Sequence, residues 1–159
     1  MVSASLDMLE ESLVKKIDVM KKIEEENERQ RELLKTPDEV NQAEFDEILD
    51  IKGELIEQLI KLDDGFQSLF DRVKEDVNKD KDMYKLQIGR MQEYIKDITG
   101  LSASIEAAER RNKKMAEEYF SAARQKMNFN RQTSAAAYNY YTTMTNYKDV
   151  PPQFLDNKN

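Results

Sequence analysis

One long stripe of apolar residues constrains the fold of this chain more than any other feature. Between Phe45 and Val73, apolar side chains recur at alternating spacings of three and four residues, and Lys52 is the one polar member. This spacing places all of them on one face of an α-helix. The stripe consists of Phe45, Ile48, Lys52, Leu55, Leu59, Leu62, Phe66, Leu69 and Val73. Apolar residues beside it widen the face beyond a two-stranded seam, which predicts the central helix of a bundle.

Two further helical patterns flank this stretch. The first runs from Leu6 to Met20 with spacings of three and four residues, and its apolar face becomes polar beyond Ile23. We therefore expect Leu34, at the polar end of that helix, to be less buried than Leu59. A third pattern resumes at Tyr84 and continues through an Ala-rich, polar half. The predicted helices span about residues 4–34, 37–77 and 82–127.

Two short segments separate these helices. In the first, Thr36 is the expected N-cap, Pro37 the first helical residue and Glu39 the partner of a capping box, which predicts a helix start at residue 37. The second, residues 78–82, is charged and lacks Gly and Pro. It permits either a turn or a continuous helix. A continuous helix over residues 37–127 would be roughly 135 Å long at about 1.5 Å per residue, and a monomer could not cover it, so we favour the turn.

The predicted fold class is all-α, an elongated antiparallel three-helix bundle of long helices formed by residues 1–127. Residues 128–159 form an aromatic C-terminal arm, because this segment has few charges and residues 138–147 hold four of the seven tyrosines. Three interpretations of the arm remain open: it docks on the bundle, it is disordered, or it binds a partner. We favour partner binding, because Tyr and Phe give large contact areas with few rotors to freeze.

The composition argues against catalysis. The chain has no His and no Cys, and its four glycines form no phosphate-binding loop, so the common nucleophiles, transition-metal ligands and nucleotide motifs are missing. We expect no enzyme activity, no catalytic residues, no cofactor and no metal site. The net charge of −7 also argues against nucleic acid as a partner, because binding would lack a strong phosphate-neutralising contribution.

A basic cluster lies on the third predicted helix. It consists of Arg110, Arg111, Lys113 and Lys114. We interpret it as a solvated helix face that pairs with nearby glutamates at helical spacing, in preference to a nucleic-acid or lipid site. No apolar run is long enough to span a membrane, and the N-terminus lacks the pattern of a signal peptide. We therefore expect a cytoplasmic protein without membrane insertion.

Two segments resemble FlgN-type flagellar export chaperones. In the central helix the matching residues are Lys52, Leu55, Ile56, Leu59, Leu62 and Asp63. The closing run from Phe154 to Asn159 looks like the Phe-Ile/Leu-Asp-Lys-Lys ending of many such chains. The resemblance implies a cytoplasmic type III (flagellar) export chaperone that holds hook–filament junction proteins before secretion. It also implies that the C-terminal part contacts the client.

The expected client is an amphipathic terminal helix of a flagellar hook-associated protein. We predict that it binds between the distal halves of the first and third helices, where the arm wraps it. The candidate partner-binding residues are Met115, Tyr119, Phe120, Met127, Phe129, Tyr138, Tyr140, Tyr141, Met144, Tyr147, Phe154 and Leu155. A structural coiled-coil spacer and an adaptor for another machine are the alternatives. The identity of the client and the choice between monomer and homodimer stay open.

Overall fold

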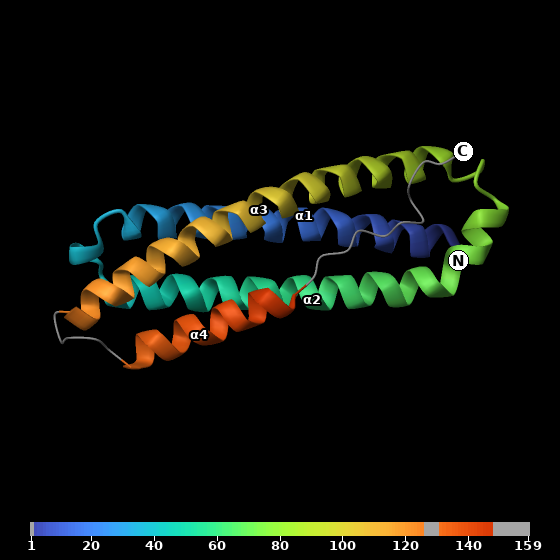
Figure 1. The fold of residues 1–159 in the computed structure, drawn as a ribbon. Helices are drawn as coiled ribbons and strands as arrows, with labels where there is room; N and C mark the ends of the chain where they lie inside the picture. The colour runs from blue at the N-terminus through green and yellow to red at the C-terminus, as the bar shows by residue number, and fades with distance from the viewer. Residues whose placement is uncertain (1, 126–130, 148–159) are drawn as a thin grey trace.

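The computed structural model describes residues 2–125 and 131–147. These residues form four α-helices and one short 3-10 helix (Figure 1). The elements are α1 (Val2–Leu34), η1 (Pro37–Glu39), α2 (Gln42–Lys79), α3 (Lys85–Gln125) and α4 (Arg131–Asn146). The predicted all-α class and the three long antiparallel helices are confirmed, and α1 and α3 run in the same direction (Figure 1).

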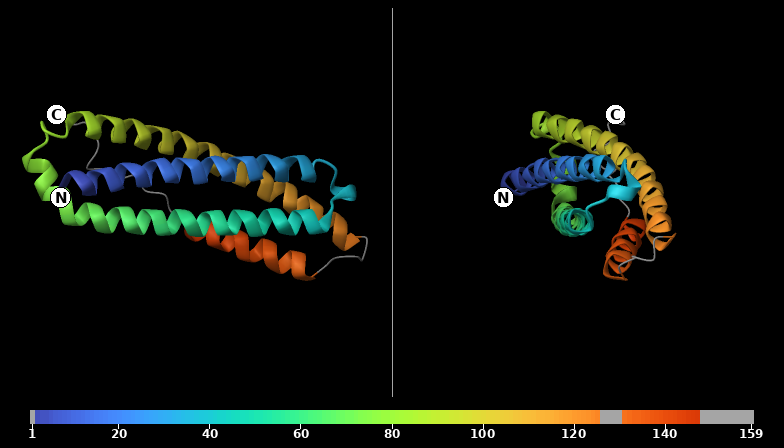
Figure 2. Two further views of the ribbon diagram at one scale, coloured as in Figure 1. Left: turned by 180° about the vertical axis from the view of Figure 1, so that it is seen from behind. Right: turned by 90° about the vertical axis from the view of Figure 1, so that its left-hand side faces the viewer.

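Helix α1 lies in the middle of the three long helices, so the prediction that the stretch from Phe45 to Val73 forms the central helix was wrong. Helix α1 packs along both α2 and α3, and the bundle is elongated (Figure 2). The predicted stripe of α2 supplies much of the core, and its residues Phe45, Ile48 and Leu59 are buried. Met91 and Ile98 of α3 are buried as well. The helical face predicted from the alternating spacing of three and four residues is thus confirmed, because this spacing keeps one face of each helix in the core.

The start of α2 differs from the prediction. Thr36 makes no side-chain cap, and the residues after it form only the single 3-10 turn η1. Val40 is extended, and α2 begins after Asn41, whose side chain accepts a 3.1 Å hydrogen bond from the backbone N–H of Glu44. The capping box at Thr36 was wrong because a better-placed Asx cap lies five residues later, after the chain has turned.

The second connection is a turn, as predicted, but it begins two residues later than the predicted segment 78–82. Helix α2 ends at Lys79, residues 80–84 form a turn, and α3 begins at Lys85. The backbone N–H of Met83 donates to the carbonyl of Asp80 within this turn, at 3.0 Å. The charged run therefore reverses the chain without Gly or Pro.

The polar half of α1 is more buried than its sequence suggests. Leu34 is only 1 % exposed, compared with 3 % for Leu59, so the expectation of a less buried Leu34 was wrong. Asn27 and Gln30 on the same half are also buried. The sequence pattern missed this because polar side chains, as well as apolar ones, face inward here.

The described part of the C-terminal arm is a helix. α4 packs on α2 and runs in the same direction along it (Figures 1 and 2). Ala137 and Tyr140 of α4 are buried against the bundle. For residues 131–147 the structure therefore corresponds to docking, the first of the three interpretations of the arm, and it adds a fourth, short helix to the three predicted ones.

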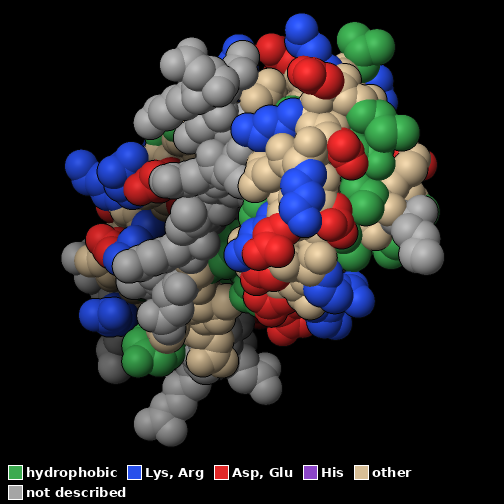
Figure 3. All heavy atoms as spheres, turned by 90° about the vertical axis from the view of Figure 1, so that its right-hand side faces the viewer, with side chains coloured by type: hydrophobic (Ala, Val, Ile, Leu, Met, Phe, Trp, Pro, Cys, Tyr) green, Lys and Arg blue, Asp and Glu red, His purple; other side chains and the backbone are tan. Residues whose placement is uncertain are grey.

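The end of the bundle that contains the α2–α3 turn carries apolar side chains at its surface. Met83 and Leu86 beside the α2–α3 turn are 77 % and 83 % exposed, and Met8 near the start of α1 is 59 % exposed. Figure 3 views this end and shows hydrophobic side chains among basic and acidic ones. Within residues 2–125 and 131–147, no helix combines the length and the apolar character needed to cross a bilayer.

Candidate functional site

A buried ion pair lies where the four helices meet. The ammonium group of Lys52 on α2 is fully buried and lies 2.8 Å from the Glu109 carboxylate of α3. It also donates a 2.8 Å hydrogen bond to the side-chain oxygen of Gln30 on α1. Burial lowers the pKa of Lys52, and the nearby Glu109 carboxylate acts in the opposite direction. A buried charge needs such partners, because an unpaired one is strongly destabilising.

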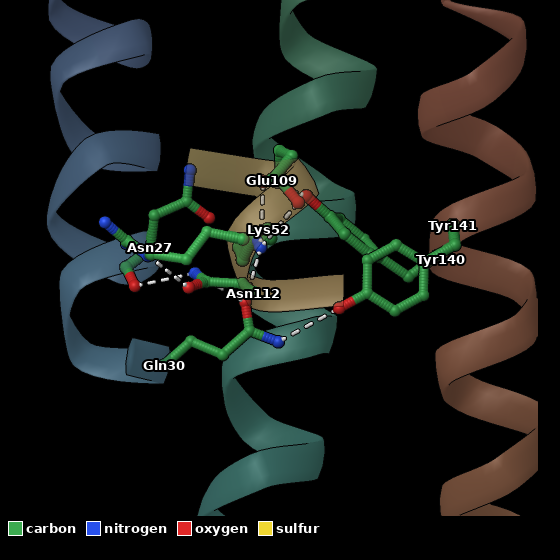
Figure 4. A network of polar contacts seen from close by, with 8 residues as sticks. Asn27, Gln30, Lys52, Glu109, Asn112, Tyr140 and Tyr141 are labelled. Atoms are coloured by element: carbon green, nitrogen blue, oxygen red, sulfur yellow. Dashed lines mark hydrogen bonds and ion pairs between the residues drawn. The ribbon is translucent and has the colours of Figure 1, made fainter. Parts of the chain in front are cut away.

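Helix α4 completes this pair. The hydroxyl of Tyr140 donates a 2.6 Å hydrogen bond to the carboxylate of Glu109. The Lys52 ammonium group also lies 4.4 Å from the centroid of the Tyr140 ring, within the range of a cation–π contact. Figure 4 shows Tyr140 reaching from α4 toward Lys52 and Glu109. Burial, followed by the adjacent Glu109 charge, raises the pKa of Tyr140.

Amide side chains extend the network toward α1. Asn112 of α3 donates hydrogen bonds to the backbone carbonyl of Asn27, at 2.8 Å, and to the side-chain oxygen of Gln30, at 3.2 Å (Figure 4). Gln30 in turn donates a 3.5 Å bond to the hydroxyl of Tyr141. All four α-helices thus contribute to one polar network inside the core. The contact between Asn112 and Asn27 also means that α1 and α3 pack directly where we expected a client cleft.

A second buried lysine repeats the arrangement near the end of α4. Lys16 of α1 lies 2.6 Å from one carboxylate oxygen of Asp63 on α2. The hydroxyl of Tyr147 donates a 2.7 Å hydrogen bond to the other oxygen. Tyr140 and Tyr147 are seven residues apart, two turns of a helix, so they face the same side. Each donates to the carboxylate partner of a buried lysine, which fixes the register of α4 on the bundle.

A cavity of about 480 Å³ lies between α3 and α4, above α1 and α2. We call it the α3–α4 cavity. Its residues are Met20, Ile23, Ile56, Leu59, Ser102, Ile105, Glu106, Glu109, Arg110, Lys113, Tyr141, Met144 and Tyr147. Apolar side chains of α1, α2 and α3 form the base. Tyr141 and Met144 of α4, with Tyr147 directly after it, form one wall, and charged residues of α3 form the other. This size is in the range of ligand pockets, about 300–1,000 Å³.

The basic cluster of α3 borders this cavity. Arg110, Arg111, Lys113 and Lys114 are exposed, as a solvated face requires. Within the part of the chain that the structure describes, Arg110, Lys113 and Lys114 make no ion pair. Glu109, one of the nearby glutamates at helical spacing from this cluster, is directed inward to Lys52 instead. The charges of Arg110 and Lys113 are therefore not neutralised by an ion pair within the described residues.

The structure brings only some of the predicted site residues together. Tyr141, Met144 and Tyr147 line the cavity. Tyr140 is buried beneath it in the ion network, whereas Tyr138 is 72 % exposed on the outer side of α4.

The other predicted residues lie elsewhere. Tyr119 and Phe120 pack their rings on Phe45, with centroids 5.4 and 5.8 Å away, so they belong to the core near η1. Met115 is partly buried against the core. Met127, Phe129, Phe154 and Leu155 lie outside the described residues.

Several important residues were missed by the sequence analysis. Glu109 was treated as part of a solvated face, and Gln30 and Asn112 were not singled out. The pairing of these three residues depends on a register between helices that one sequence does not reveal. Two signals were available. Lys52 interrupts an otherwise apolar stripe, and Ala137, Tyr140, Tyr141 and Met144 recur at the spacing of one helix face.

The fold and the site define an all-α bundle with an aromatic cavity and a buried ion network. Comparison of the chain with protein-family models, curated proteins and solved structures finds no match.

Proposed function

We propose that this chain is a non-catalytic cytoplasmic export chaperone of the type III (flagellar) system, which holds a hook–filament junction protein before secretion. The observation that carries this proposal is the α3–α4 cavity, with an apolar base, an aromatic wall and a charged mouth. Protein partners bind through such surfaces, because aromatic and methionine side chains give large, adaptable contacts.

The position of α4 supports a modified version of the expected binding mode. α1 and α3 contact each other through Asn27 and Asn112, which leaves no open cleft between them at that level. α4 instead lies beside α2 and offers Tyr141, Met144 and Tyr147 to the cavity. A client helix would then bind between α3 and α4, with the helix-in-groove mode that we expected.

The ion network supports a preformed site. Tyr140 and Tyr147 hold α4 at two points, through hydrogen bonds of 2.6 and 2.7 Å to carboxylates. A wall that is held in place before binding loses little conformational entropy when a partner arrives. This preformed wall favours a binding protein over a structural spacer, whose function requires no cavity.

Calorimetric titration tests the proposal. Each hook–filament junction protein encoded by the same genome is purified and titrated into the full-length chain, with the major filament protein as the control. We expect saturable binding of a junction protein at micromolar or lower Kd, which corresponds to about −8 kcal/mol or more favourable. Absence of binding to every junction protein would contradict the export function and would favour the spacer or another adaptor role.

A further inference from the structure

We propose that the α3–α4 cavity selects an acidic amphipathic helix of its partner protein, with apolar side chains inserted into the cavity and carboxylates bound by Arg110 and Lys113. The class of partner, an export client, rests on the function proposed above. The sign of the partner's charge and the place where it binds rest on the cavity itself.

The base of the cavity requires an apolar contact face. Met20 and Ile23 of α1, Ile56 and Leu59 of α2 and Ile105 of α3 converge there. A partner gains free energy in proportion to the apolar area that it removes from water on this base. The two side walls are helices, and a partner helix placed between them would complete the layer over α1 and α2. Its apolar residues would then follow the spacing of three and four that one helix face gives.

The mouth of the cavity determines the charge of the partner. Its exposed charged residues are Glu106, Arg110 and Lys113, all on α3. The opposite wall contributes no charge, because residues 132–147 contain no Asp, Glu, Lys or Arg. Glu109 also borders the cavity, but its carboxylate is held by Lys52 and Tyr140.

Arg110 and Lys113 lie on the same side of α3. They are three residues apart, so their side chains are neighbours on the helix surface. Neither makes an ion pair within residues 2–125 and 131–147. Arg111 and Lys114 follow directly and add two positive charges beside the mouth, whereas Glu117, whose charge acts on Tyr141 of the opposite wall, adds one negative charge. In a chain with a net charge of −7, this local excess of cations favours carboxylates on the partner and disfavours cations.

Two designed peptides test this inference with the full-length chain. Both are labelled amphipathic helices with the same apolar face of Leu and Met. One carries Glu at the positions that flank this face, and the other carries Lys there. We expect the Glu peptide to bind at least about tenfold more tightly than the Lys peptide in fluorescence anisotropy. The ratio should fall as NaCl is raised from about 0.05 to 0.5 M, because salt screens exposed charges.

Variants locate the contact. The double variant Arg110→Ala/Lys113→Ala should bring the two peptides to equal affinity. Lys81→Ala/Lys85→Ala is the matched control, since it removes the same charge from exposed positions beside the α2–α3 turn, away from the cavity. Ser102→Trp places a large side chain at the cavity and should weaken both peptides. Circular dichroism of each variant confirms that the bundle is folded.

Four results with the peptides would overturn the inference. These are equal affinity for the two peptides, no saturable binding of the Glu peptide up to about 1 mM, no effect of Arg110→Ala/Lys113→Ala, and an equal effect of the control pair. Preference for a fatty acid or an anionic vesicle over the Glu peptide would also contradict it. If the peptides behave as expected but no junction protein binds, the result supports the proposed site and contradicts the export function. If a junction protein binds and the variants do not change peptide affinity, the result supports the export function and contradicts the proposed site.

Discussion

The hydroxyl of Tyr140 donates a 2.6 Å hydrogen bond to the carboxylate of Glu109 and thereby joins the fourth helix to the third inside the core. The same carboxylate holds the buried ammonium group of Lys52. Because a hydrogen bond to a charged group is stronger than one between neutral groups, this contact and the bond from Tyr147 to Asp63 should contribute more to the position of α4 than its contacts with neutral groups. The wall of the cavity therefore depends on a residue that does not line it.

Removal of this hydroxyl should destabilise the protein. Tyr140→Phe keeps the ring on Lys52 and deletes only the bond to Glu109, so we expect a loss of about 1.5–3 kcal/mol in the free energy of unfolding. Urea denaturation followed by circular dichroism measures it. Tyr138→Phe is the matched control, since Tyr138 is 72 % exposed on the same helix and should change little. Equal losses in the two variants would show that the Tyr140 bond is not formed in solution.

The same tyrosine should make the protein sensitive to alkali. Burial and the Glu109 charge raise the pKa of Tyr140, so folding stabilises its neutral form. This stabilisation is complete below the unfolded pKa of about 10 and is lost as the pH rises above it. Between about pH 10 and 11, the wild-type chain should lose about 1 kcal/mol more than Tyr140→Phe, because the unfolded phenol is only partly ionised at pH 10. Parallel pH profiles of the two urea midpoints would contradict a buried neutral phenol.

The buried pair should tolerate removal of both charges better than removal of one. Lys52→Met leaves the Glu109 carboxylate without its cation, which should cost about 3–5 kcal/mol. The double variant Lys52→Met/Glu109→Gln removes both charges and retains an oxygen that accepts the Tyr140 bond. It should recover most of that loss. Thermal unfolding of the three chains checks this, and a double variant as unstable as the single one would argue that Glu109 is uncharged or solvated.

Leu34 at the end of α1 and Leu59 near the middle of α2 should contribute about equally to stability. Leu34 and Leu59 are 1 % and 3 % exposed, so Leu34→Ala and Leu59→Ala should each cost about 2–5 kcal/mol, the range for truncation of a buried leucine. Urea midpoints give the comparison. A much smaller loss for Leu34→Ala would restore the expectation from the sequence, in which the far half of α1 has little to bury.

The long helices were predictable from the sequence because their apolar residues repeat at helical spacing over many turns. The stripe from Phe45 to Val73 and the turn after residue 78 could be predicted without knowing which helices pack together. The start of α2 was not predictable in the same way, since Thr36 and Asn41 are both good caps and only the path of the chain decides between them. Leu34 was misjudged because its neighbours on the face, Asn27 and Gln30, are polar residues that are nevertheless buried.

The site was predictable only in part. The aromatic segment at 138–147 was identified, and three of its residues line the cavity. Its helical spacing at Ala137, Tyr140, Tyr141 and Met144 was overlooked, because few charges and many Thr and Asn residues suggest an irregular arm. The pairing of Lys52 with Glu109 joins residues 57 positions apart. Such a contact depends on how two helices are aligned, which no periodicity within either helix determines.

Methyl NMR of the methionines tests the central claim, that a client binds in the α3–α4 cavity, most directly. Met20 and Met144 line the cavity, whereas Met8 and Met83 are 59 % and 77 % exposed outside it. The full-length chain, labelled at its methionine methyl groups, is titrated with a hook–filament junction protein, and single Met→Leu variants assign the signals. Saturable shifts of Met20 and Met144, with Met8 and Met83 unchanged, are the predicted result. Shifts confined to Met8 and Met83 at saturation, or no shifts at all, would contradict it.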